Sequence, residues 1–282
     1  MIQKSFVKND KGKLYLVPTP IGNMDDITLR GIKILKSVDY IYAEDTRVTL
    51  NLLSFFDIKK KVFSCHKYSE EKNKFSIIDK LNYGFDIAYV SDRGTPSISD
   101  PGEIIVKEAI KNNIDVISLP GANALLPALT VSGLSTDRFL FYGFLSSKKN
   151  ERINELKELN SVIYTIIFYE SPHRIIDMLR DMLEIFGNRN ISISREISKM
   201  FEEVYRGTIK DAFENYSNPK GEFVIVVEGN NTKEEIDYVD KVNELVNKGE
   251  KMSTAIKEIA TIYGISKNRL YEMCKERLIW NW

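Results

Sequence analysis

The chain has 282 residues, 43% of them hydrophobic, and its 40 Lys and Arg residues balance 40 Asp and Glu residues. The length suits two domains, and this apolar fraction builds packed cores, which excludes a disordered chain. The formal charge of zero excludes a chain-wide basic field, so a nucleic acid would have to be bound by a local patch.

Cysteine usage and hydropathy bear on the compartment. Cys65 and Cys274 lie far apart in the sequence, which gives no disulfide framework and fits a reducing environment. The opening MIQKSFVKNDKGK lacks the apolar core of a signal peptide. No run approaches the ~18 apolar residues that a membrane span requires. The sequence therefore predicts a soluble, cytoplasmic protein without a membrane partner.

The first part of the chain alternates short apolar runs with stretches of helical spacing. In residues 25–38, Ile27, Gly31 and Leu35 share one helical face, with Asp25 or Asp26 as the expected N-cap. Strand, helix, strand order with continuous apolar strands predicts a parallel sheet that is covered on both faces. The expected strands are KLYLVP (13–18), VDYIYAED (38–45), KKVFSCH (60–66), FDIAYVSD (85–92) and IDVISLPG (114–121), and a second helix is expected over 100–113.

A second set of apolar runs follows a helix expected over 122–137, broken or bent at Pro127 and closed near Gly133. The gap between 190–196 and 202–209 is too short for a crossover helix, so these two runs should pair antiparallel in a mixed sheet. The expected strands are RFLFYGFL (138–145), SVIYTIIFYE (161–170), NISISRE (190–196), EEVYRGTI (202–209) and GEFVIVVEG (221–229).

The C-terminal segment carries a helix-turn-helix spacing. Ala260, Gly264 and Leu270 supply a small contact residue, a turn and an apolar anchor, and Ser266 is a natural N-cap for the second helix. Six basic residues against three acidic ones over 251–282 leave a net charge of +3. Nucleic-acid contact and a solvated helical cap both fit this pattern.

These patterns predict an α/β protein with two α/β domains and a small C-terminal helical extension. The first domain, with the parallel sheet, is expected over residues 1–120, and the second, with the mixed sheet, over 121–234. The helix-turn-helix-like extension is expected over 235–282.

Common cofactor motifs are missing. The sequence has no G-x-G-x-x-G, no G-x-x-x-x-G-K-[ST] and no G-x-S-x-G. His66 adjoins Cys65, but neighbouring side chains on an extended segment point apart, so no metal is expected. Three Gly- and Pro-rich loops instead follow expected strands of the first domain: PTPIGN (18–23), SDRGTPSISDPG (91–102) and PGANA (120–124). Because the carboxyl ends of parallel strands share one edge, these loops should converge on one ligand site.

With these three loops, the sequence resembles a known family, the tetrapyrrole methylase-like class of S-adenosylmethionine methyltransferases. Within it, the chain looks like the small-subunit ribosomal RNA methyltransferase I branch, which methylates the ribose 2'-oxygen of a cytidine in the decoding region of 16S ribosomal RNA. Arg93 and Ala122 depart from the pattern of that branch, where a small residue and a Pro are common. The resemblance rests on LYLVPTPIGNMDDITLRGIKILKSVDYIYAEDTR, SDRGTPSISDPG, SGLSTDRFLFYGFL, FYESPHRI, EEVYRGTI and GEFVIVVEG, in that order.

The resemblance implies S-adenosylmethionine bound in a cleft between the two α/β domains and held chiefly by main-chain groups. It also implies a homodimer that acts on ribosomal RNA of the small subunit within a ribosomal particle. The cofactor site implied by the resemblance comprises Pro20, Ile21, Gly22, Ser91, Asp92, Gly94, Thr95, Pro96, Asp100, Gly121 and Ala124.

Chemistry suggests further roles. A ribose hydroxyl needs a general base, and the acids at strand ends, Glu44, Asp45, Asp92, Asp100 and Glu170, are the candidates. Of these, Glu170 and Asp100 are favoured, although Glu170 also fits a helix N-terminal acid beside its neighbouring Ser. The expected RNA-binding residues are basic side chains near these strand ends, in the loop 146–152 and in the C-terminal extension: Arg47, Arg93, Lys148, Lys149, His173, Arg174, Arg195, Lys199, Lys267 and Arg269.

Two other functions fit the same residues. A methyltransferase of this fold could act on a tetrapyrrole or on a histidine derivative of a translation factor, for which a deep apolar cleft without a basic surround is expected. A nucleic-acid-binding regulator could instead combine the helix-turn-helix with a ligand-sensing body.

Overall fold

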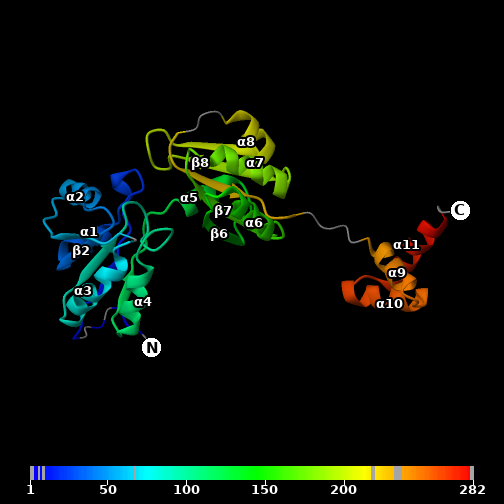
Figure 1. The fold of residues 1–282 in the computed structure, drawn as a ribbon, viewed down its shortest axis with the longest axis horizontal. Coiled ribbons are helices and arrows are strands. Elements are labelled where there is room, and N and C mark those ends of the chain that lie inside the picture. Colours follow the sequence, from blue (N-terminus) through cyan, green and yellow to red (C-terminus); the bar gives the residue numbers. More distant parts are fainter. Residues whose placement is uncertain are drawn as a thin grey trace. The chain divides into compact units, whose positions relative to one another are not determined.

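The chain folds into two compact units, Met1–Gly229 and Asn230–Trp282. The computed structural model describes residues 3–5, 7, 10–66, 68–216, 220–231 and 237–279. In Figure 1 the first unit runs from blue to yellow and contains two sheets, and the second, from orange to red, is helical.

The first sheet is parallel, as predicted. It has five strands in the order β3-β2-β4-β1-β5, and every neighbouring pair is parallel. Its strands are β1 (Leu14–Leu16), β2 (Tyr40–Ala43), β3 (Val62–Ser64), β4 (Ile87–Val90) and β5 (Val116–Ser118). The continuous apolar run of β4 is buried throughout, since the strand is central and covered on both faces.

Helices cover both faces of this sheet. One apolar cluster contains Leu35 and Leu53 from two helices, and the cluster on the other face contains Ile77 and Ile105 from two others. The helices of this part are the 3₁₀ turn η1 (Met24–Asp26), α1 (Leu29–Ser37) and α2 (Thr46–Phe55), with α3 (Glu70–Asn82) and α4 (Glu103–Lys111) on the opposite face.

The N-cap expected at Asp25 or Asp26 is wrong. Both residues lie in η1, and α1 begins three residues later, after Thr28. The Thr28 hydroxyl accepts the Gly31 N–H at 2.9 Å, as an N-cap does. The Asn23 side chain accepts the Asp25 N–H at 3.1 Å, which directs this segment into a separate turn.

The second sheet is mixed. Its order is β6-β7-β10-β8-β9; β6 and β7 are parallel, and the other neighbours are antiparallel. The antiparallel β8–β9 pair confirms the prediction from their short connection. The strands are β6 (Phe139–Phe144), β7 (Thr165–Glu170), β8 (Asn190–Arg195), β9 (Glu203–Thr208) and β10 (Phe223–Val227).

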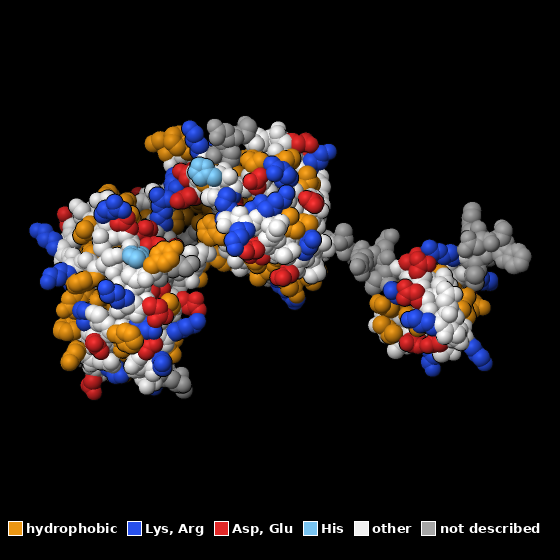
Figure 2. Space-filling model, in the orientation of Figure 1, with side chains coloured by type: hydrophobic (Ala, Val, Ile, Leu, Met, Phe, Trp, Pro, Cys, Tyr) orange, Lys and Arg blue, Asp and Glu red, His pale blue; other side chains and the backbone are white. Residues whose placement is uncertain are grey.

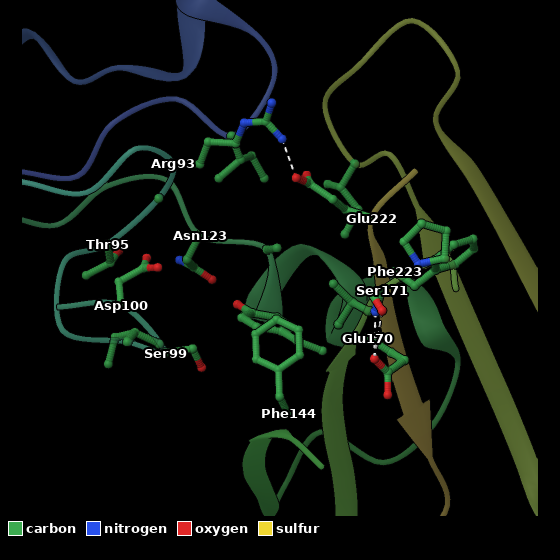
Figure 3. Close-up of a pocket in the computed structure, with 18 residues that line it drawn as sticks. Arg93, Thr95, Ser99, Asp100, Asn123, Phe144, Glu170, Ser171, Glu222 and Phe223 are labelled. Atoms are coloured by element: carbon green, nitrogen blue, oxygen red, sulfur yellow. Dashed lines mark hydrogen bonds and ion pairs between the residues drawn. The ribbon is translucent and has the colours of Figure 1, made fainter. Parts of the chain in front are cut away.

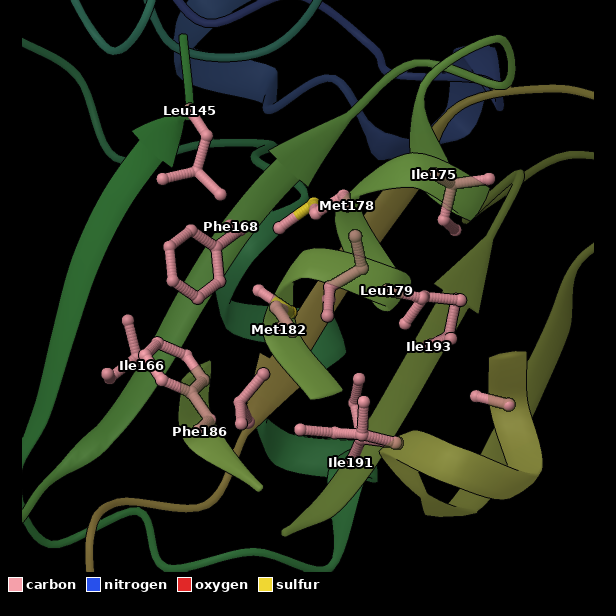
Figure 4. Close-up of a cluster of buried hydrophobic side chains, with 14 of the residues drawn as sticks. Leu145, Ile166, Phe168, Ile175, Met178, Leu179, Met182, Phe186, Ile191 and Ile193 are labelled. Carbon is pink, nitrogen blue, oxygen red and sulfur yellow. The ribbon is translucent and has the colours of Figure 1, made fainter. Parts of the chain in front are cut away.

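The helices of this part are α5 (Leu125–Ser132), α6 (Lys149–Leu159), α7 (Ile175–Phe186) and α8 (Ile209–Asn215). One face of the sheet packs on α6, α7 and α8 through a core that includes Phe168 and Met178 (Figure 4). The other face packs on α5 through Ala128 and Leu129. This arrangement confirms the expected α/β architecture with two sheets.

The expected break at Pro127 is wrong. Helix α5 is continuous, and Pro127 is its third residue. In the first turn the backbone N–H groups have no partner within the helix, so a proline there removes no hydrogen bond. The predicted end at Gly133 is confirmed, because this residue has φ 77° and forms a left-handed C-cap.

The C-terminal unit has three described helices, α9 (Tyr238–Asn247), α10 (Met252–Tyr263) and α11 (Lys267–Ile279). Ala260 and Leu270 are buried in their common core, and Gly264 ends α10 with φ 64°. The spacing read from the sequence therefore corresponds to two helices joined by a short turn. None of the described helices is long and apolar enough to cross a membrane.

Candidate functional site

A cavity of about 310 Å³ lies within the first compact unit, between loops of the parallel sheet and strand ends of the mixed sheet. Figure 3 shows Thr95, Ser99 and Asp100 on one side of it and Phe144, Glu170 and Phe223 on the other. Its lining residues are Ile21, Arg93, Gly94, Thr95, Ile98, Ser99, Asp100, Asn123, Ala124, Phe144, Tyr169, Glu170, Ser171, Pro172, Ile197, Glu222, Phe223 and Val224.

The three Gly- and Pro-rich loops contact one another at this cavity. Thr19 and Gly94 exchange two backbone hydrogen bonds of 2.9 Å, which join the first loop to the second. The Thr95 hydroxyl donates to the Ala122 carbonyl at 3.0 Å, which joins the second loop to the third. Gly94 has φ 76°, a conformation that favours glycine. The loops therefore converge as the strand order predicted.

Gly121 is required by close packing. A Cβ there would lie 2.7 Å from the Pro18 ring, so the first and third loops approach each other too closely for a side chain. A main-chain cradle of this kind leaves backbone donors and acceptors available to a ligand.

A buried carboxylate that sequence reasoning did not identify stabilises the second loop. Glu70 is 3% exposed, and its Oε1 accepts the N–H groups of Gly102, Ile104 and Ile105 at 3.0–3.2 Å. These are unpaired donors at the start of α4, where a negative charge is favourable. Glu70 thus fixes the end of the loop that carries Asp100.

Asp100 is the most perturbed acid of the cavity. Burial, followed by the negative charges of Glu44 and Asp92, raises the pKa of Asp100 to about 7. Burial and Asp92 also raise the pKa of Glu44. Asp92 itself accepts the Asp45 N–H at 2.8 Å. A cationic ligand beside these acids would therefore be stabilised, and Asp100 would exchange a proton near neutral pH.

Glu170 is more enclosed. It is 2% exposed, and its Oε1 accepts the Ser171 N–H at 2.7 Å. Its Oε2 accepts no hydrogen bond of good geometry among the described residues, although Arg174 Nη2 lies 3.2 Å away. Burial raises the pKa of Glu170, while Ser171 and Arg174 oppose that shift. The side chain thus lines the cavity and also holds the start of the following turn.

An ion-pair network joins the two sides of the cavity at its rim. Arg93, from the second loop, pairs with Glu222 beside β10. Lys199, from the β8–β9 connection, lies 2.8 Å from both Glu222 and Glu196. Ser198 in the same connection donates a hydrogen bond to Asp26 of the first part. Arg93 is 53% and Glu222 62% exposed, so this pairing is accessible to solvent and to a competing anion.

A second cavity, of about 250 Å³, shares Ile21 and Arg93 with the first. The predicted cofactor residues divide between the two. Those that line the first cavity are Ile21, Gly94, Thr95, Asp100 and Ala124. Those that line the second are Pro20, Ile21, Gly22, Ser91 and Asp92. Pro96 and Gly121 line neither.

The sequence did not identify the strand-end side chains that form the apolar wall of the first cavity: Phe144, Tyr169, Ile197, Phe223 and Val224. Burial raises the pKa of Tyr169 to about 12, so its phenol stays protonated. These side chains could have been found from the sheet edge that the ends of β6, β7 and β10 share. Using that edge requires the order of the strands in the sheet, which does not follow from the sequence.

The predicted RNA-binding residues have different surroundings. Arg47 is paired with Asp45, Lys148 with Glu151 and Arg195 with Glu203. Arg174 instead donates to the carbonyls of Leu145 and Ser146. The exposed members of the set are Arg47, Arg93, Lys148, Lys149, His173, Lys267 and Arg269, the last two at the start of α11. On the face shown in Figure 2, Lys and Arg side chains are interspersed with Asp and Glu.

The side chains that line the first cavity suit an organic cation with an aromatic group better than a metal ion. Its wall is rich in apolar side chains, and Asp100 and Glu170 lie on opposite sides (Figure 3). Within the described ranges, no group of three or more His, Cys, Asp or Glu side chains is placed to hold a metal ion. S-adenosylmethionine, which carries an adenine, a sulfonium and an ammonium, fits this set of groups.

Comparison with known proteins bears on the family and the fold. Residues 13–212 match the family model of tetrapyrrole (corrin/porphyrin) methylases. The chain is 46% identical over 276 residues to ribosomal RNA small subunit methyltransferase I of Halalkalibacterium halodurans, covering 94% of this chain and 96% of that protein. It is 44% identical to the Bacillus subtilis protein of the same name, covering 94% of each.

Solved structures share the fold at low sequence identity. A diphthine synthase superposes with a TM-score of 0.62 at 17% identity, covering 77% of this chain and 90% of that one. A uroporphyrin-III-C-methyltransferase from Thermus thermophilus gives 0.54 at 17% identity, covering 77% and 94%. At this identity the likeness concerns the fold alone.

Proposed function

We propose the following function for this chain, which belongs to the tetrapyrrole (corrin/porphyrin) methylase family. It is an S-adenosylmethionine-dependent methyltransferase that acts on the ribose 2'-oxygen of a cytidine in the decoding region of 16S ribosomal RNA. The observation that carries the proposal is the similarity over nearly the whole chain to relatives named ribosomal RNA small subunit methyltransferase I.

The first cavity is the proposed cofactor site. When bound, S-adenosylmethionine would supply a methyl group from its positively charged sulfur to the ribose 2'-oxygen, leaving a neutral thioether. The proton of the ribose hydroxyl would pass to a general base of the protein. The main chain around Gly94, Thr95 and Ala124 would bind its polar groups. Tyr169 and Phe223 would form the apolar wall against its adenine. The remaining predicted cofactor residues shape the loops that hold these groups.

Asp100 is the favoured general base. A carboxylate with a pKa of about 7 is matched to proton transfer near neutral pH. Glu170 is the second candidate, and its contacts with Ser171 and Arg174 also suit a role in holding the cavity wall. What these residues contribute besides proton transfer is alignment of the acceptor and exclusion of water.

RNA phosphates are proposed to meet the rim of the first cavity and the start of α11. Arg93 and Lys199 lie at that rim, and Lys267 and Arg269 lie at the exposed N-terminal turn of α11. Residues Arg47, Lys148, Lys149, His173, Arg174 and Arg195 complete the proposed set. The homodimer and the cytoplasmic location, both expected from the sequence, also remain proposals.

The function is tested by methyl transfer. Purified protein is incubated with tritiated S-adenosylmethionine and small ribosomal subunits from cells that lack the enzyme, and label in the RNA is measured. We expect stoichiometric labelling of the 16S RNA. Absence of label, with cofactor binding intact by calorimetry, would contradict the proposal and favour a tetrapyrrole or a translation factor. Cofactor-independent binding to duplex DNA without any methyl transfer would favour a regulator.

A further inference from the structure

The second cavity has a composition distinct from that of the first. Met24, Val48 and Leu52 give it apolar walls, while Ser91 and Asp92 place polar groups among them. Its volume, about 250 Å³, is below the ~300 Å³ at which sites for drug-sized ligands begin. A flat, small ring with polar edges suits this combination of walls and size.

The position of the second cavity matches the requirement for a second reactant. Ile21 and Arg93 belong to the linings of both cavities, so the two spaces are neighbours. Methyl transfer needs the acceptor oxygen directly beside the methyl donor. If the cofactor occupies the first cavity, the second cavity is the neighbouring space that the acceptor nucleotide can occupy.

From these observations, and resting on the proposed function, we propose that the second cavity holds the base of the target nucleotide, with Asp92 accepting a hydrogen bond from its exocyclic amino group. Enzymes that act on a nucleotide within folded RNA commonly take it out of the stack into such a pocket. With the base between Met24, Val48 and Leu52, its ribose would lie toward Ile21 and Arg93, which line both cavities.

Asp92 gives the pocket its selectivity. Its Oδ1 accepts the Asp45 N–H at 2.8 Å, which orients the carboxylate. An ionised carboxylate only accepts hydrogen bonds and retains further acceptor positions. It therefore favours the amino group of cytosine and repels the carbonyl that uracil carries at the same position.

Two cationic side chains of the second cavity are available to bind the phosphate of the nucleotide. Arg93 and Lys199 both line the second cavity. In the structure they share Glu222 as a partner, with Lys199 at 2.8 Å. Because Glu222 is 62% exposed, a phosphate can replace its carboxylate at these two side chains.

Two matched substitutions test the assignment of the cavities. Val48 is 41% exposed and lines the second cavity, and Ile98 is 40% exposed and lines the first, so both accept a large side chain without disturbing the core. Calorimetry measures the Kd of S-adenosylmethionine, and tritium transfer to small subunits from cells lacking the enzyme measures activity. Ile98→Trp should weaken cofactor binding by about tenfold or more, whereas Val48→Trp should leave it within about threefold and reduce methyl transfer at least about tenfold.

The outcomes separate this inference from the function on which it rests. Equal weakening of cofactor binding by Val48→Trp and Ile98→Trp would overturn the inference and assign both cavities to the cofactor. Unchanged methyl transfer by Val48→Trp would overturn it as well. A wild-type protein that labels no RNA would instead overturn the proposed function, and this inference with it.

The role of Asp92 is tested by exchanging the target base. On subunits whose target cytidine is replaced by uridine, wild-type transfer should fall by about tenfold to a hundredfold. Asp92→Asn offers an amide donor to the uracil carbonyl, so this preference should shrink to within about threefold. Because the Asp92 charge also acts on Asp100, the cofactor Kd should shift, but by no more than about threefold. Asp79→Asn, which removes an exposed carboxylate of α3, is the control and should behave as wild type. An undiminished cytidine preference in Asp92→Asn, or a parallel loss of cofactor affinity, would contradict the role.

Discussion

Replacing Asp100 by Asn should stabilise the protein without ligand and weaken its function. The pKa of Asp100 is raised to about 7 by burial and by Glu44 and Asp92, whereas an unfolded Asp has a pKa of ~3.9. Between these two values the folded state keeps a proton that the unfolded state releases. Stability is therefore full below about pH 4 and falls as the pH rises toward about 7.

The magnitude follows from the shift. About three pKa units at ~1.36 kcal/mol each correspond to ~4 kcal/mol, and screening at this partly exposed side chain halves that to about 2 kcal/mol. Asn removes the charge with little change in shape. We therefore expect Asp100→Asn to be more stable than wild type by about 2 kcal/mol at pH 8 and by less than about 1 kcal/mol at pH 5.

Urea unfolding of both proteins at pH 5 and pH 8, in the absence of ligand, measures these differences. Asp79→Asn, which removes an exposed carboxylate, is the control and should match wild type at both pH values. Cofactor affinity of the wild type should rise between pH 6 and pH 8, since the ionised carboxylate attracts the sulfonium, and this rise should be lost in Asp100→Asn. A variant no more stable than wild type at pH 8, or a gain in stability independent of pH, would show that burial of the Asp100 charge does not destabilise the folded protein.

Four further predictions concern residues around the site. Glu170→Gln should leave the cofactor Kd within about threefold and slow methyl transfer by about a hundredfold if Glu170 is the base; an equal loss of cofactor affinity measured by calorimetry would assign it to binding instead. Glu70→Ala leaves three N–H groups at the start of α4 without their acceptor, two of them buried, and should lower the free energy of unfolding by about 3 kcal/mol. Glu70→Gln keeps an acceptor oxygen and should lose less than half of that in the same urea titration, so equal losses would argue against the hydrogen bonds. Glu222→Gln removes an anion that competes with RNA phosphate, so RNA affinity at low salt should rise about threefold relative to Glu103→Gln, and a fall in filter-binding affinity would contradict that competition. Deleting residues 230–282 should weaken RNA binding and reduce its salt dependence while sparing the cofactor Kd, and an unchanged salt dependence would reject this unit as an RNA contact.

Sequence patterns were sufficient for features that depend on local chemistry. Buried parallel strands are continuous apolar runs, and their loops must meet at one edge, so the contacts of Thr19 with Gly94 and of Thr95 with Ala122 followed from the pattern. The short β8–β9 connection likewise determined an antiparallel pair.

Features that depend on long-range packing did not follow. Glu70 lies in α3, more than thirty residues from the N–H groups that it accepts, and nothing in its local sequence distinguishes it from a surface Glu. Val48 lines the second cavity only because α2 packs beside the first loop. The misplaced N-cap at Asp25 or Asp26 and the expected break at Pro127 had another cause, since a propensity does not decide at which turn a helix begins.

The identity of the methylated nucleoside decides whether this protein is a ribose methyltransferase of 16S RNA. Small ribosomal subunits from cells lacking the enzyme are incubated with the protein and isotopically labelled S-adenosylmethionine, and the RNA is digested and analysed by mass spectrometry. We expect label in 2'-O-methylcytidine at a single position of the 16S RNA. Label on a base, or label that appears only when a tetrapyrrole or a translation factor is supplied, would contradict it.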